Sequence, residues 1–170
     1  VTILDDDPLP TVTLVASNLS MGETNGSSTI TVVLSAVSGK DVTTTLVKSG
    51  TAKDIFDYSL SGASILIPAG STSGSVRLAA SGDSLDEFDE TVILDIDTVT
   101  NGTESAPQQQ TVTIIDDDLT PTVTLSTGTA TLSEPSGSTA VTVTLSAVAG
   151  RAVTVILGKT GTAADDLDYT

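Results

Sequence analysis

Residues 112–125 read VTIIDDDLTPTVTL, and residues 1–14 read VTILDDDPLPTVTL. Each stretch has a run of alternating apolar and polar residues, then three aspartates, then a second alternating run that starts at a proline. Strict alternation is the pattern of a β-strand with one buried face. The repeated wording predicts tandem β-domains, each of which ends in an acidic triplet.

The repeat continues well beyond these two stretches. At a shift of 111 residues, which places Pro121 on Pro10, 25 of the 50 positions in 10–59 are identical to their partners in 121–170. We therefore expect one complete domain at 10–118, the end of a preceding repeat at 1–9, and the incomplete first half of a following repeat at 119–170. The chain is then a piece of a longer array, and its last part should be incompletely paired beyond about residue 125 unless a neighbouring chain supplies strands.

The composition favours strands over helices. Val, Ile and Thr are abundant, whereas the chain has two Phe, two Tyr and no Trp, so the core must be aliphatic. Seven alternating runs are separated by turn-rich segments. We predict an all-β fold, a seven-stranded immunoglobulin-like antiparallel β-sandwich, with strands near 11–15, 28–35, 41–48, 63–67, 74–80, 91–97 and 111–116.

The charge balance excludes several classes of function. The 22 acidic residues outnumber 6 basic ones and give a net charge of -16, which disfavours nucleic acid and favours cations or basic partners. The chain has no Cys and no His, so it has neither a disulfide framework nor the usual zinc ligands. It also contains no apolar run long enough for direct insertion into a membrane.

Two apparent enzyme motifs do not support catalysis. The sequence GDSL at 82–85 matches the name of a lipase class, but the chain has no His to activate Ser84. Glu87 and Glu90 resemble a glycosidase acid and base, but sugar subsites need aromatic platforms that this chain lacks. We expect no enzymatic activity. The aromatic residues of these segments are predicted to pack beneath the acidic loops: Phe56, Tyr58 and Phe88.

The acidic residues are predicted to gather at one end of the sandwich. If successive strands alternate in direction, the segments after the first, third, fifth and seventh strands lie at the same end. These segments hold 11 of the 15 acidic residues in 10–118: Glu23, Asp54, Asp57, Asp83, Asp86, Glu87, Asp89, Glu90, Asp116, Asp117 and Asp118. Calcium, which takes six to eight oxygen ligands in flexible geometry, would relieve their repulsion, and this many oxygens would serve more than one ion. The alternative is a solvated acidic surface that keeps the domain soluble.

Four motifs occur in an order that resembles the Calx-beta domain: GTAKDIFDYS, IPAGSTSGSVRL, GDSLDEFDETVIL and VTIIDDD. This family includes calcium-sensing domains of sodium-calcium exchangers and tandem repeats of large extracellular surface proteins. The resemblance covers 10–118 and continues to the Asp-Tyr motif that begins at Asp168. It implies the same seven-stranded sandwich.

The resemblance also implies a set of calcium ligands. Transferred motif by motif, the ligands are Glu23, Asp57, Asp83, Glu87, Glu90, Asp116, Asp117 and Asp118. The partial repeats carry matching acidic residues at Asp5, Asp6, Asp7, Glu134 and Asp168, but neither partial repeat holds a complete set.

We expect a calcium-binding structural repeat that stiffens the junctions of a multidomain, adhesin-like protein at the cell surface or in the extracellular space. Its partners are then neighbouring repeats, with cell-surface or matrix molecules as further candidates. Similar copies at a constant period favour this function, because an array needs interchangeable modules. The alternatives are a calcium-sensing domain coupled to a transporter or another effector, and a calcium-independent spacer.

Overall fold

The computed structural model describes the chain except for residues 3, 5, 164–167 and 169–170. Asp5 therefore lies outside the described residues. The chain forms two compact units. The first consists of Val1–Ser84 and Phe88–Asp117, and the second of Leu85–Glu87 and Asp118–Thr170.

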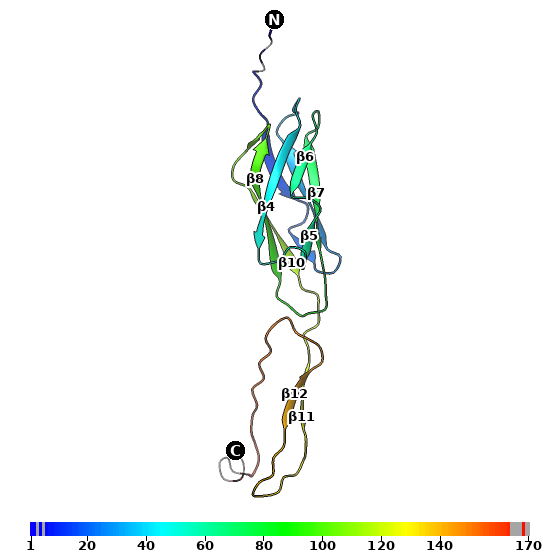
Figure 1. Ribbon diagram of the computed structural model, residues 1–170, viewed down its shortest axis with the longest axis vertical. Helices are drawn as coiled ribbons and strands as arrows, with labels where there is room; N and C mark the ends of the chain where they lie inside the picture. Colours follow the sequence, from blue (N-terminus) through cyan, green and yellow to red (C-terminus); the bar gives the residue numbers. More distant parts are fainter. Residues whose placement is uncertain (3, 5, 164–167, 169–170) are drawn as a thin grey trace. The chain divides into compact units, whose positions relative to one another are not determined.

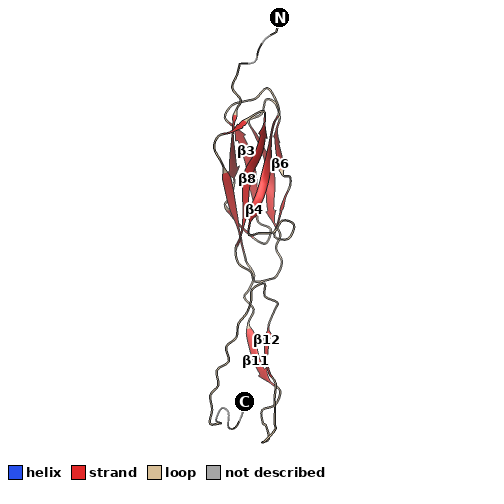
Figure 2. Cartoon of the chain, turned by 60° about the vertical axis from the view of Figure 1, so that its left-hand side comes forward, coloured by secondary structure: helices blue, strands red, loops and turns tan. Residues whose placement is uncertain are grey.

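The first unit contains two five-stranded sheets (Figures 1 and 2). One has the order β5-β7-β3-β1-β9 and is built from β1 (Thr11–Ala16), β3 (Ser27–Leu34), β5 (Tyr58–Leu60), β7 (Ser73–Ala80) and β9 (Thr103–Glu104). The other has the order β2-β10-β8-β4-β6 and is built from β2 (Ser20–Gly22), β4 (Val42–Gly50), β6 (Ser64–Ile67), β8 (Glu90–Thr100) and β10 (Gln109–Ile115). Most pairs are antiparallel, but β1 with β9 and β10 with β2 are parallel.

The predicted all-β sandwich is confirmed, and each of the seven predicted strands corresponds to a strand of this unit. The unit has three further strands, β2, β5 and β9, which are only two or three residues long. A segment this short cannot show an alternating pattern, so its sequence gives no signal of a strand.

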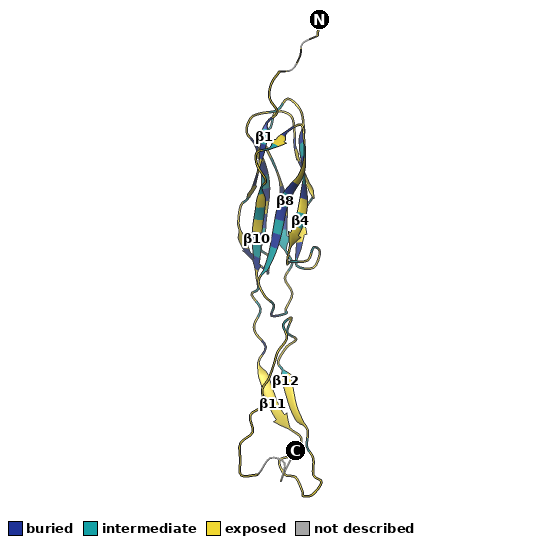
Figure 3. Cartoon of the chain, turned by 90° about the vertical axis from the view of Figure 1, so that its left-hand side faces the viewer, coloured by how far each residue is buried: buried dark blue, intermediate teal, exposed yellow. Residues whose placement is uncertain are grey.

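The core is mostly aliphatic, and its buried residues alternate along the strands with less buried ones, as the colour bands of Figure 3 show. In β3 and β8, for example, every second residue is buried over much of the strand. Tyr58 is buried as predicted, but Phe56 is 75% exposed and Phe88 is 71% exposed, so the prediction that these two pack beneath the loops is wrong. Tyr58 is the one aromatic residue of the core cluster among the described residues, and it pairs with Ala80 where β5 meets β7.

The second unit contains one two-stranded antiparallel sheet of β11 (Val123–Thr127) and β12 (Val141–Leu145). Val123 pairs with Leu145, and at the shift of 111 residues this is the same register as Val12 with Leu34 between β1 and β3. All five residues of β11 are exposed (Figure 3). The described part of this unit thus makes the first strand pair of a repeat, without a second sheet to cover it.

No helix among the described residues has the length and apolar character needed to cross a membrane.

Gly50 is the last residue of β4 and pairs with Val92 of β8. Its φ is 115°, and a Cβ atom there would lie 2.1 Å from the carbonyl oxygen of Thr91. We expect Gly50→Ala to lower the free energy of unfolding by about 2 kcal/mol or more, from backbone strain and from the clash. Urea unfolding measures this change.

Gly39→Ala is the matched control, because a Cβ atom there meets nothing within 4 Å. It should change the free energy of unfolding by less than about 0.5 kcal/mol. Equal effects of the two substitutions would contradict the role assigned to Gly50.

Candidate metal centre

Three hydrogen bonds in the first unit each join two acidic segments that are distant in sequence. The bonds run from Glu23 N–H to the carbonyl of Ile115 (2.9 Å), from Ser81 N–H to the carbonyl of Asp57 (2.9 Å), and from Asp116 N–H to Asp89 Oδ1 (3.2 Å). These bonds link the acidic segments in pairs: 23 with 115, 57 with 81, and 89 with 116.

Three carboxylates among the described residues lie close enough together to hold a metal ion. One oxygen atom from each of Glu23, Asp83 and Asp118 lies within 4.8 Å of the other two. Glu23 follows β2 and is 8% exposed, and its Oε1 accepts a hydrogen bond of 2.9 Å from Asp83 N–H. Asp118 is half-buried and follows the end of β10 by three residues. Two loops and the C-terminal end of a strand thus bring hard oxygen donors to one point.

The other two aspartates of the triplet lie beside this group in the chain. Asp117 Oδ1 accepts a hydrogen bond of 3.0 Å from the hydroxyl of Thr24, the residue after Glu23. Asp116 Oδ1 is buried and has no hydrogen-bond partner within the described part of the chain. A buried carboxylate oxygen without a donor is costly, and a bound cation would remove that cost.

The remaining predicted ligands lie outside the group of three. Asp57 is half-buried, and its Oδ2 accepts a hydrogen bond of 2.5 Å from Lys53 N–H. Glu90 pairs with Ile114 at the start of β8. Glu87 belongs to the second unit and lies next to Gly150, where an added Cβ atom would come within 2.7 Å of Glu87 Oε1. Metal binding by all eight residues stays a prediction.

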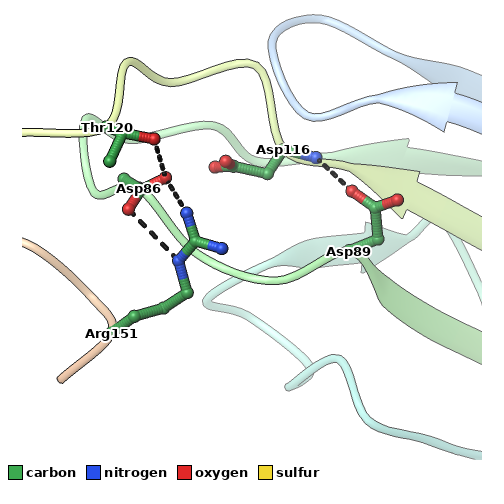
Figure 4. A network of polar contacts seen from close by, with 5 residues as sticks. All are labelled: Asp86, Asp89, Asp116, Thr120 and Arg151. Atoms are coloured by element: carbon green, nitrogen blue, oxygen red, sulfur yellow. Dashed lines mark hydrogen bonds and ion pairs between the residues drawn. The ribbon is translucent and has the colours of Figure 1, made fainter. Parts of the chain in front are cut away.

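Asp86 is an acidic residue whose charge is neutralised by the protein. It is 4% exposed and lies in the second unit, where it accepts hydrogen bonds from Arg151 Nε at 3.1 Å, from Arg151 Nη2, and from the Thr120 hydroxyl at 3.2 Å (Figure 4). A buried carboxylate requires such partners. The sequence alone did not reveal this pair, because Arg151 lies 65 residues further along the chain.

Lys48 and Asp54 form a second ion pair, close to Tyr58. Burial raises the pKa of the Tyr58 phenol above its ordinary value of 10.0, the Asp54 carboxylate raises this pKa further, and the Lys48 ammonium group lowers it. Asp54 is therefore paired with a cation of the protein, and it lies outside the group formed by Glu23, Asp83 and Asp118.

Comparison with known proteins places the chain in a family. A sequence model described as Calx-beta domain matches residues 5–118 and again residues 116–170. The chain belongs to the Calx-beta family. The two Calx-beta matches overlap at 116–118, so the aspartate triplet is common to both.

Three solved structures resemble the chain. The apo-form Calx CBD1 domain has a TM-score of 0.57 and 20% identity over 65% of this chain and 99% of that one. CBD12 from CALX1.2 has a TM-score of 0.54 and 20% identity over 62% and 45% of the two chains, and the calcium binding domain CBD12 of CALX1.1 has 0.52 and 23% over 59% and 42%. The chain thus spans less than half of either CBD12 structure, and identities this low show a shared fold. A comparison with curated proteins finds no match.

The raised pKa of Tyr58 predicts a loss of stability in alkali. The folded Calx-beta domain favours the neutral phenol, so this contribution is fully present below the ordinary pKa of 10.0 and is lost as pH rises through the higher pKa of the folded state. The free energy of unfolding should fall as pH rises above 10.0, and we expect Tyr58→Phe to make this fall smaller. Urea unfolding of both chains across the alkaline range measures the difference, and parallel pH profiles would contradict it.

Proposed function

We propose that the acidic end of the complete repeat binds calcium, and that bound calcium stiffens the junction between successive Calx-beta repeats of a cell-surface or secreted protein. The observation that carries this proposal is the group formed by Glu23, Asp83 and Asp118, whose oxygen atoms lie within 4.8 Å of one another. Asp118 also belongs to the segment shared by the two family matches, so the group includes the residue at which one repeat gives way to the next.

The chemistry of these donors fits calcium. Calcium is a hard cation that takes carboxylate, carbonyl and water oxygens in flexible geometry, whereas magnesium requires a stricter octahedron. Glu23, Asp83 and Asp118 would hold the first ion. Asp116, two residues before Asp118, has a buried Oδ1 without a hydrogen-bond donor among the described residues, and this oxygen is a candidate for a further ligand. We assign any second ion to the remaining predicted ligands: Asp57, Glu87, Glu90 and Asp117. One of the similar structures is described as a calcium binding domain, which supports the same ligand here.

The stiffening follows from where the three carboxylates are attached. Glu23 follows β2, Asp83 follows β7, and Asp118 leads through Pro121 to β11. Without a cation, like charges at this spacing repel one another, and this repulsion opposes the hydrogen bonds that hold Asp116 and Asp117 near the loops. When calcium is bound, the carboxylates attract the ion in common, which restrains the loops and the linker together. The protein residues bind and restrain, and they carry out no reaction.

A calcium-sensing domain coupled to a transporter or another effector is the second candidate function. The shared fold with the CBD12 structures supports it. The match covers less than half of each CBD12 chain, so in those proteins a domain of this fold is joined to a further part of the chain. The identity of 25 in 50 positions between repeats instead favours the structural module. If the domain is a structural module, neighbouring repeats are its main partners, and cell-surface or matrix molecules are candidates for a further partner.

Calorimetric titration of calcium into the chelator-stripped chain tests the proposal. Asp83→Asn removes one carboxylate of the group, and we expect it to weaken the tightest binding step at least about tenfold. The matched control is Asp97→Asn, which makes the same change of charge at an exposed position on β8 and should bind as the unmodified chain does. Magnesium should bind much more weakly than calcium to all three proteins.

The affinity then separates the candidate functions. Millimolar binding fits an extracellular structural repeat, and micromolar binding fits a sensor. If calcium produces no heat and leaves the melting temperature of the unmodified chain unchanged, the acidic end is a solvated surface and the domain is a calcium-independent spacer.

A further inference from the structure

The outer edge of β1 is only partly covered by another strand. Its neighbour β9 is two residues long and pairs with β1 at Thr11 and Val12 alone. On its other side, β1 pairs with β3 along its length from Val12 to Ala16. The backbone groups of Leu14 therefore face the open edge, and an open edge of this kind is a template on which another chain can add a strand.

Two glutamine side chains occupy this edge. Gln108 Nε2 donates a hydrogen bond of 2.7 Å to the carbonyl of Val12, and Gln108 Oε1 accepts one of 2.8 Å from Leu14 N–H. Gln110 Nε2 donates a hydrogen bond of 3.1 Å to the carbonyl of Leu14. The two glutamines are two residues apart, so both side chains lie on the same face of the chain. Together they use the backbone groups of Leu14 that a further strand would need.

The glutamine amides continue the pattern of bonds that β9 begins. Thr103 N–H donates to the carbonyl of Pro10 at 3.0 Å, and Ser105 N–H donates to the carbonyl of Val12 at 3.2 Å. A primary amide has both N–H donors and a C=O acceptor, as a peptide group does. Gln108 donates to Val12 and accepts from Leu14, which is the pair of bonds that one residue of a parallel strand makes.

The glutamines are themselves held in place. Gln108 N–H donates to Glu104 Oε1 at 2.8 Å, and Gln110 is paired with Leu94 in the ladder between β10 and β8. Gln110 belongs to β10 of the other sheet, and Gln108 directly precedes that strand, so both side chains bond to the edge of the opposite sheet. Both glutamines are half-buried, which favours retention of these hydrogen bonds.

The same chain contains a strand that matches this edge. Residues 121–125 repeat the sequence PTVTL of residues 10–14, and all five residues of β11 are exposed. Among the described residues β11 pairs only with β12, so its outer edge carries no strand. Similar repeats, such as these with 25 identical residues in 50 positions, are prone to pair with one another in the wrong combination, and natural proteins block open edges against this.

We propose that Gln108 and Gln110 guard the edge of β1 and keep it from accepting β11 of a second copy of the chain. Because the two glutamines occupy this edge, similar repeats can lie close together without exchanging strands. It uses neutral amides, so it operates with or without calcium and does not rest on the function proposed above.

Gln108→Ala combined with Gln110→Ala in the full chain tests this proposal. Gln109→Ala is the matched control, because Gln109 lies between the two glutamines and is exposed. Sedimentation velocity over a range of protein concentrations should show dimer formation at least about tenfold tighter in the double variant than in the control or the unmodified chain. Hydrogen exchange of residues 11–16 should be faster in the dilute double variant and should slow as its concentration rises.

Two further variants keep the result decisive. If the double variant does not fold, Gln110→Ala removes a single hydrogen bond and should shift association in the same direction by a smaller factor. Leu125→Pro, added to the double variant, removes an N–H from the outer edge of β11 and should abolish the dimer. The edge guard is overturned if the glutamine variants associate no more than Gln109→Ala, and the role of β11 is overturned if the dimer persists with Leu125→Pro.

Discussion

Mutual repulsion among carboxylates is the constraint on which the acidic end of the sandwich depends. The protein offsets part of it with its own groups: Lys48 pairs with Asp54, and the Thr24 hydroxyl donates to Asp117. Glu23, Asp83 and Asp118 still hold oxygen atoms within 4.8 Å of one another. A fold that places three such groups together at the start of a linker is suited to a divalent cation, and the proposed stiffening of the array follows from that placement.

The sandwich supplies the rigidity that this arrangement needs. Aliphatic side chains from both sheets are completely buried, including Val12, Leu14 and Leu94, and they fix the strands from which the acidic loops extend. The same strands create an open edge at β1, which the amides of Gln108 and Gln110 cover. Carboxylates in the loops thus provide the candidate metal ligands, and glutamine amides protect the edge of β1.

The fold could be predicted almost completely from the sequence, because seven alternating runs and a 111-residue period leave little freedom in the choice of architecture. The prediction that acidic segments gather at one end rested on strand direction, and three of the predicted residues, Glu23, Asp83 and Asp118, do lie together. The exposure of Phe56 and Phe88 could not be predicted, because an aromatic residue in a loop has no period that indicates its direction. The Asp86–Arg151 pair and the glutamine contacts join residues far apart in sequence, with separations of 65 and about 95 positions, and a single sequence carries no signal for such contacts.

Hydrogen exchange of the full chain with and without calcium tests the central claim most directly, because it locates any ordering within the domain. We predict that calcium slows exchange in residues 20–24, 81–90 and 115–120, and that it leaves residues 36–41 and 101–106 at the opposite end unchanged. Exchange that is the same in all of these segments at saturating calcium would contradict the assignment of a calcium-restrained junction to the acidic end.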